Sequence, residues 1–431
     1  MLTIKLFFFI SIGLLTMWKI KFANITYFIY AVRYAFSKKN KSDSGASGVG
    51  SITALMSQLA GNLGVGNFAG SALALYYGGP GVIVWFFILS FLCSAIKFGE
   101  VVLAHKFRTI DNGIIKGGLF YVIEKGLGKK YKIFAFFSAL SVLIIAVSSG
   151  AMQFNQINNL FFAQNGILKI DIKIYIFTLF VGILVGIILF GGLKKIGLAA
   201  DILVPIMGCL YIGSCLLIIA LNSHNILTAF NLVYQGFFNF KSGVITTVII
   251  SLNRLISATD TGAGFSAISQ SNSNLKMSGQ QGLISFFDPF IVATIMAIGA
   301  FAILIVGVPY NEPQFMGLLA IKQVFISVNR SFEYMLIFIA FMFGFTTIMA
   351  VGFYVQQACI YLFGLRFKKL YIVLYVIIYS FVGLSDTIWI FDNLDIAYTI
   401  GGFINLVAIF LLLPQIKEIW QEYLDKKNTY E

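Results

Sequence analysis

Residues 59–70 read LAGNLGVGNFAG and residues 258–264 read ATDTGAG, and each stretch lies within a long apolar segment. Glycine and short polar side chains lower helix stability, so we predict that each segment is a helix that breaks there. Inside a membrane such a break is tolerated only where it faces protein or a water-filled cavity. Taken together, the two stretches predict a binding site between two discontinuous helices. For either stretch alone, the alternative is close helix packing through small residues.

The composition around these stretches excludes a soluble protein. The chain has 431 residues, of which 59% are hydrophobic and only 11% are charged. Soluble domains are about 25% charged. Soluble enzymes and nucleic-acid binders are therefore excluded, and we predict an all-α polytopic membrane protein.

The apolar runs predict about eleven membrane spans, since a bilayer core needs roughly 20 apolar residues in a helix. The expected spans are residues 5–20, 49–75, 80–107, 132–161, 172–190, 197–221, 242–270, 283–306, 331–363, 369–385 and 386–415. We expect four regions: an extra helix with a basic linker (1–48), two five-helix halves (49–221 and 242–415) and a short cytoplasmic tail (416–431). The second half must be inverted relative to the first, and each begins with a broken helix. Such 5+5 inverted repeats are a transporter architecture.

The basic residues predict the orientation of the chain. The formal net charge is +13, and 22 of the 30 lysines and arginines fall on one predicted side against six on the other. The positive-inside rule then places the N-terminus outside and the C-terminus in the cytoplasm of a plasma membrane, such as a bacterial inner membrane. The positive charge is explained without a nucleic-acid partner.

Several motifs resemble those of one transporter family. Residues 59–70 are similar to its LAGTVGTGNIAG segment, residues 78–81 to its GGPG turn, residues 191–196 to GGIKRI and residues 345–348 to FTTI. In this order they resemble the alanine or glycine:cation symporter family, of LeuT-like fold, over nearly the whole chain. The resemblance implies symport into the cell of a small neutral amino acid, driven by Na⁺ or H⁺, with no cofactor beyond the coupling ion.

The resemblance also implies a substrate site at the two breaks. The carboxylate of an amino acid would meet N–H groups at residues 64–66 and the Asn67 side chain, and its ammonium would meet carbonyls freed at residues 258–261. Gln153 is similar to the family's Q-x-N stretch; it either lines this pocket or forms an interhelical hydrogen bond. The candidate substrate residues are Gly64, Gly66, Asn67, Gln153, Thr259, Asp260 and Val351.

A cation site is expected beside the first break. Thr346 and Thr347 resemble, by their spacing, the sodium site shared by LeuT-like transporters, with the carbonyls of Ala60 and Leu63. Hard cations prefer oxygen ligands, which these groups supply without a carboxylate. The alternative is that both threonines hydrogen-bond to their own helix.

The sequence departs from the family's motifs near the expected pocket. Leu119 stands where proline is usual, Thr259 where asparagine, Asp260 where glutamate and Val351 where tryptophan. Smaller side chains at a pocket wall leave volume, so we predict tolerance of substrates larger than alanine. An H⁺-coupled or altered-substrate transporter of the same fold is therefore an alternative. A lipid-modifying membrane enzyme is disfavoured, since the two histidines are unpaired.

Ionisable residues deep in apolar runs are functional candidates. Asp260 is the most central of them. Lys97 and Glu100 lie one turn apart, and the alternative to a functional role is a structural ion pair between them. For Asp288, shaping a helix break and responding to protonation both remain open.

Overall fold

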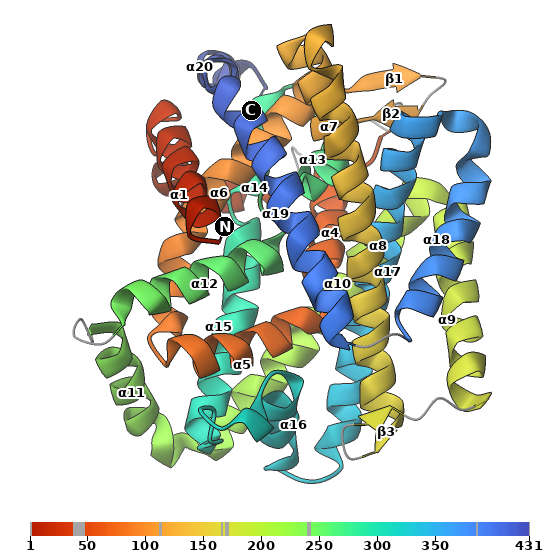
Figure 1. The fold of residues 1–431 in the computed structure, drawn as a ribbon. Helices are drawn as coiled ribbons and strands as arrows, with labels where there is room; N and C mark the ends of the chain where they lie inside the picture. The colour runs from red at the N-terminus through yellow and green to blue at the C-terminus, as the bar shows by residue number, and fades with distance from the viewer. Residues whose placement is uncertain are drawn as a thin grey trace.

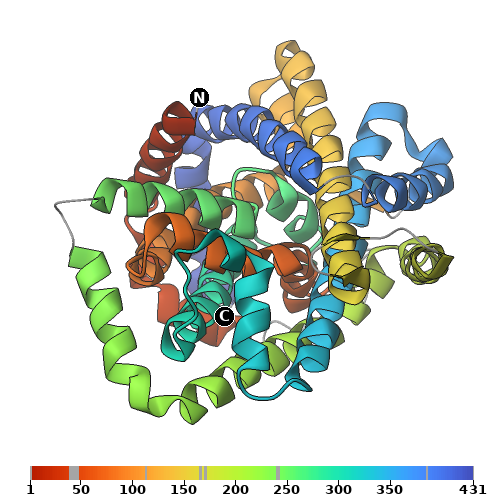
Figure 2. The ribbon, with the colours of Figure 1, turned by 60° about the horizontal axis from the view of Figure 1, so that its bottom comes forward.

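A computed structural model gives the fold and describes residues 2–37, 48–111, 114–164, 167–168, 172–238, 243–384 and 387–430. The described chain is almost entirely helical (Figures 1 and 2). Its strands form two small antiparallel hairpins, β1 (Thr109–Asp111) with β2 (Ile114–Lys116) and β3 (Ala163–Gln164) with β4 (Ile167–Leu168). The predicted helical class is confirmed, with these two hairpins as local exceptions.

The helices follow one another along the chain with short connections. The first half of the chain contains α1 (Leu2–Lys19), α2 (Ala23–Thr26), α3 (Phe28–Ala35), α4 (Ser51–Asn62), α5 (Val65–Gly78), α6 (Val82–Phe107), α7 (Leu119–Val122), α8 (Lys132–Phe162), α9 (Ile172–Phe190), α10 (Gly192–Leu221) and α11 (Ile226–Phe238). The second half contains α12 (Val244–Thr259), α13 (Phe265–Gln270), α14 (Ser278–Ser285), α15 (Asp288–Val306), α16 (Leu318–Ile326), α17 (Phe332–Phe363), α18 (Lys368–Val382), α19 (Thr387–Leu411) and α20 (Leu413–Tyr430). The described residues also contain short 3₁₀ or π turns: η2 (Ile123–Leu127), η3 (Lys129–Tyr131), η4 (Ser223–Asn225), η5 (Pro313–Phe315) and η6 (Leu365–Phe367).

Both predicted helix breaks are confirmed. The first lies at residues 63–64, between α4 and α5, and α5 runs across the view of Figure 1 while α4 stands upright. The second lies at residues 260–264, between α12 and α13. Here Asp260 has φ 52°, and Gly262 and Gly264 both have φ 87°. Glycine adopts this left-handed backbone without the steric cost that a side chain brings, which explains why the sequence places glycines there.

Six described helical segments are long and apolar enough to cross a membrane, and a bent pair, residues 396–411 and 413–427, would make a seventh. The chain is therefore a multi-pass membrane protein. A broken helix is too short on either side of its break to pass this length test. The total of eleven spans, the division into two halves and the orientation stay predictions.

The two breaks lie at the centre of the helix packing. α17 packs along α8 and also contacts α4, α10 and α13, while α6 contacts α12, α13, α14 and α15. α9 and α18 lie side by side at one edge of the molecule, on the right in both views (Figures 1 and 2). The site is thus enclosed by helices from both halves of the chain.

The C-terminal stretch expected as a tail is a packed helix. α20 buries Trp420 and Tyr423, and the Trp420 ring lies 5.6 Å from the Phe98 ring and 5.4 Å from the Tyr27 ring. The elbow at Leu412 turns α20 by 61° from α19, so that its apolar side covers α6 and α14. Part of the expected basic linker, residues 38–47, lies outside the described residues.

Candidate functional site

Side chains satisfy the backbone groups that the first break releases. The Val65 N–H, at the start of α5, donates to Gln153 Oε1 on α8 at 2.8 Å. Asn67 Nδ2 donates to the Asn62 carbonyl at 3.0 Å. A Cβ added to Gly64 would lie 2.6 Å from the Gln153 amide nitrogen, so only glycine allows this approach. The expected interhelical hydrogen bond of Gln153 is therefore present.

The second break is held from two sides at Gly262. Its N–H donates to Glu100 Oε1 on α6 at 2.9 Å, and its carbonyl accepts from Asn405 Nδ2 on α19 at 3.0 Å. Ser138 on α8 donates to Asn405 Oδ1 at 2.7 Å and fixes the orientation of that amide. The neighbouring Asp260 carboxylate accepts a hydrogen bond from the Tyr398 hydroxyl. Both breaks thus have polar side chains that hydrogen-bond to the unwound backbone, as backbone groups inside a membrane require.

A cavity of about 80 Å³ lies between the two breaks. One wall comes from residues 61–70 of α4 and α5, and another from residues 254–260 of α12 and its break. Residues of α8 and α19 complete the lining, so the cavity joins both halves of the chain. Its lining residues are Gly61, Asn62, Gly66, Asn67, Ala69, Gly70, Leu73, Ser149, Met152, Gln153, Arg254, Ser257, Ala258, Asp260, Leu394 and Tyr398.

Four of the seven candidate substrate residues line this cavity: Gly66, Asn67, Gln153 and Asp260. Gly64 stands directly behind it, against Gln153. The other two candidates lie elsewhere. Thr259 is fully buried and its hydroxyl bonds to the Leu255 carbonyl at 2.7 Å. Val351 is fully buried within α17, and neither residue is part of the cavity lining.

Sequence reasoning missed several lining residues, most notably Arg254 and Tyr398. Arg254 carried a usable signal, because a charged residue inside an apolar run is a functional candidate by default. Tyr398 carried none, because a single tyrosine in an apolar helix has many other roles. Its contact with Asp260 joins residues 138 positions apart in the sequence.

The expected cation ligands converge only in part. Thr347 Oγ1 lies 3.0 Å from the Ala60 carbonyl oxygen and 3.2 Å from that of Leu63. It also lies 3.0 Å from the Phe343 carbonyl of its own helix. A hydroxyl has one proton to donate, so three carbonyl oxygens around it form an oxygen-rich pocket that suits a hard cation. Thr346 shares the Phe343 carbonyl, at 3.0 Å, but its hydroxyl lies against the Met207 sulfur at 3.5 Å rather than against the Ala60 and Leu63 carbonyls.

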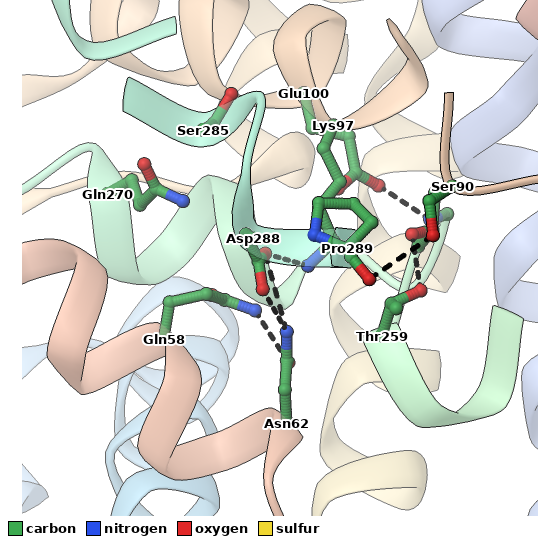
Figure 3. Close-up of polar contacts among 12 residues, drawn as sticks. Gln58, Asn62, Ser90, Lys97, Glu100, Thr259, Gln270, Ser285, Asp288 and Pro289 are labelled. Carbon is green, nitrogen blue, oxygen red and sulfur yellow. Dashed lines mark hydrogen bonds and ion pairs between the residues drawn. The ribbon is translucent and has the colours of Figure 1, made fainter. Parts of the chain in front are cut away.

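A fully buried ion pair supports the first break. Lys97 on α6 pairs with Asp288 at the start of α15, and both side chains are completely shielded from solvent. Asn62 Nδ2 donates to Asp288 Oδ1 at 3.0 Å, and Gln58 donates to Asn62 Oδ1 at 2.8 Å (Figure 3). Asp288 also stands at a helix N-terminus, where negative charge is favoured. Lys97 therefore pairs with Asp288 rather than with Glu100. Glu100 instead accepts the hydrogen bond from Gly262 at the second break.

Comparison with known proteins agrees with this architecture. The profile of the sodium:alanine symporter family matches residues 1–431. The chain belongs to that family. It is 31% identical to an uncharacterized transporter of Haemophilus influenzae, over 97% of this chain and 93% of the relative. It is 30% identical to the sodium/alanine symporter AgcS of Methanococcus maripaludis, over 93% of this chain and 89% of the relative.

A solved structure shows the same fold. The substrate-bound, outward-open form of a Na⁺-coupled sialic acid symporter aligns with a TM-score of 0.54, covering 93% of this chain and 86% of its own. The two sequences are 14% identical, so this likeness concerns the fold alone. The LeuT-like fold predicted for this family member is confirmed, and the family and this neighbour are transporters rather than enzymes.

We predict that Lys97→Met strongly destabilises this family member, because it leaves Asp288 as a buried charge without a partner. The expected cost is about 3–5 kcal/mol, measured as a loss of thermal stability in detergent. The double variant Lys97→Met/Asp288→Asn removes both charges and should recover most of that loss. Lys322→Met, which breaks the partly exposed pair with Glu333, serves as the control and should cost about 1 kcal/mol or less. Equal losses for the two single variants would show that the buried pair has no structural role.

Proposed function

We propose that this protein is a secondary transporter that couples the entry of a cation, Na⁺, to the uptake of a small neutral amino acid such as alanine or glycine. Its place in the sodium:alanine symporter family supports the reaction class. The single observation that carries the proposal is the first helix break, which contributes to the cavity on one side and to the Thr347 oxygen pocket on the other. The proposed location is the plasma membrane, with the N-terminus outside and the C-terminus in the cytoplasm.

The chemistry of the cavity suits a zwitterion. The Asn67 amide bonds to the Asn62 carbonyl through one N–H and has a second N–H to donate, and the N-terminus of a helix such as α5 favours a carboxylate. On the facing wall, the Asp260 carboxylate and the backbone of residues 257–258 present acceptors that suit an ammonium group. The small volume, about 80 Å³, favours a substrate with a short side chain. The small cavity supports alanine or glycine, the family's usual substrates, as the substrate, and it does not support a pocket enlarged at Val351.

The oxygen pocket around Thr347 supplies the proposed cation site. The Ala60 and Leu63 carbonyls come from the end of α4, while Thr347 comes from α17. A cation there would tie α17 to the first break, only three residues from Gly66 in the cavity. Ordering this segment would favour binding of the amino acid, and linkage requires the amino acid to favour the cation equally.

Proton coupling is the alternative in the same fold. Asp260 lines the cavity, and Asp288 is connected to the first break through Asn62, so either carboxylate is a candidate proton carrier. The oxygen pocket favours Na⁺, because it offers carbonyl and hydroxyl oxygens without a carboxylate.

We predict that the two adjacent threonines differ in their effect on Na⁺. Thr347→Val removes the hydroxyl that meets two carbonyls of the first break, whereas Thr346→Val removes one that faces Met207. The Na⁺ concentration for half-maximal uptake should rise by at least about tenfold, or roughly 1.4 kcal/mol, for the first variant. It should change little for the second, which has the same loss of volume and serves as the control. An unchanged Na⁺ dependence in Thr347→Val would favour proton coupling.

We also predict that Gly66→Leu abolishes amino-acid binding while the protein still folds. A Cβ at this position would lie 3.0 Å from the flexible end of Met152, and the rest of the leucine would fill the cavity. Gly213→Leu on α10 is the control, because a Cβ there meets no atom within 4 Å. Binding is measured with radiolabelled alanine, and folding by size-exclusion chromatography. Normal alanine binding by folded Gly66→Leu would place the substrate elsewhere.

The function itself is tested by uptake into proteoliposomes with and without an inward Na⁺ gradient. We expect labelled alanine to accumulate only with the gradient, and glycine and alanine to compete better than valine or glutamine. Accumulation driven by a pH gradient alone would support the proton alternative. Stronger competition by the larger amino acids would restore the enlarged-pocket interpretation of Val351.

A further inference from the structure

Another cavity lies outside the central one, beside the turns that follow α7. It is an apolar groove of about 210 Å³ between α19, the start of α8 and the turns η2 and η3. Its walls include Ile123, Leu127, Tyr131, Phe403, Val407 and Leu411. The groove is much larger than a water site and is lined almost wholly by carbon atoms.

The turns that form one wall of this groove are strongly basic. Four exposed lysines fall within eight residues of the turns η2 and η3 and the start of α8: Lys125, Lys129, Lys130 and Lys132. The Lys130 ammonium lies 5.0 Å from the centre of the Tyr131 ring, which itself lines the groove. Within the described residues, no carboxylate forms an ion pair with any of the four. The adjacent Glu124 instead accepts a hydrogen bond from Tyr361 at 2.6 Å.

This arrangement lies at the level of lipid headgroups. Residues 108–131 connect two long apolar helices, α6 and α8, so this connection stands at the membrane surface, and the first turns of α8 enter the hydrocarbon. An apolar slot that opens beside clustered lysines fits an amphiphile with a negative head and a hydrocarbon tail. A neutral lipid would fit the slot but leave the lysines without a counterion.

We propose that this groove is a binding site for an anionic phospholipid, with an acyl chain between α19 and the η2–η3 turns and the phosphate held by Lys125, Lys129 and Lys130. Phe403, Val407 and Leu411 in the groove wall belong to the same helix as Tyr398 and Asn405, which hold the second break. A bound lipid therefore stabilises the helix that closes one side of the central cavity.

The test is native mass spectrometry of the purified full-length protein, titrated with phosphatidylglycerol, phosphatidylcholine or glycerol phosphate. We expect one tightly retained phosphatidylglycerol, weaker retention of phosphatidylcholine and no retention of glycerol phosphate. The variant Lys125→Gln/Lys129→Gln/Lys130→Gln should bind phosphatidylglycerol on the order of a hundredfold more weakly. Its matched control is Lys194→Gln/Lys195→Gln/Lys369→Gln, which removes three exposed lysines that do not border the groove.

A second variant tests the groove itself. Val407→Trp fills the slot and leaves all four lysines in place, so it should also lose the retained lipid, and size-exclusion chromatography should show that the protein still folds. Equal weakening by the two triple variants would show a general attraction to positive charge and overturn the site. Equal retention of phosphatidylglycerol and phosphatidylcholine by the unaltered protein, or full retention by Val407→Trp, would overturn it as well.

Discussion

A backbone N–H or C=O group in the middle of a bilayer has no water to bond to, and this constraint organises the whole structure. Each of the two broken helices releases such groups at the place where the protein needs open backbone. Gln153 and Asn67 satisfy the first break, and Glu100 and Asn405 satisfy the second. Asn67 belongs to the broken helix itself, but Gln153, Glu100 and Asn405 come from α8, α6 and α19, so these contacts form only in the assembled fold.

α6 links the two breaks to each other. Lys97 and Glu100 lie one turn apart, and together they reach both of them, Lys97 through Asp288 and Asn62 and Glu100 directly at Gly262. Buried charges are costly unless paired, so this arrangement constrains how far either break can move on its own. The central cavity thus lies between segments whose positions depend on one another. A coupled transporter needs this property, because binding of a ligand at one segment must change the affinity for the other ligand at the second segment.

Much of this could be predicted from the sequence, because it depends on local chemistry. The glycine clusters marked the two breaks, and the left-handed backbone at Gly262 and Gly264 explains why glycine stands there. Composition alone gave the membrane class. What depends on the rotation of a helix could not be predicted. Consecutive helical residues point about 100° apart, and in this structure Thr347 contacts the carbonyls of the first break while Thr346 contacts Met207.

Contacts between distant parts of the chain were equally hidden. Lys97 and Asp288 are 191 residues apart, and nothing in either local pattern selects one as the partner of the other. Val351 was expected in the pocket from a motif departure, but its place on α17 directs it into packed helix rather than cavity. The packed α20 was missed because a charged C-terminal stretch resembles a solvent-exposed tail. Its aromatic residues Trp420 and Tyr423, which are buried, were the sequence feature that indicated a packed helix despite the charge.

The most direct test of the proposed sites is a cryo-electron microscopy structure in lipid nanodiscs, determined in Na⁺ with and without alanine. We expect alanine to add density in the cavity between Asn67 and Asp260, and an ion to appear among the oxygens of Ala60, Leu63 and Thr347. Alanine density at any other place, with this cavity unchanged between the two structures, would contradict the proposed substrate site.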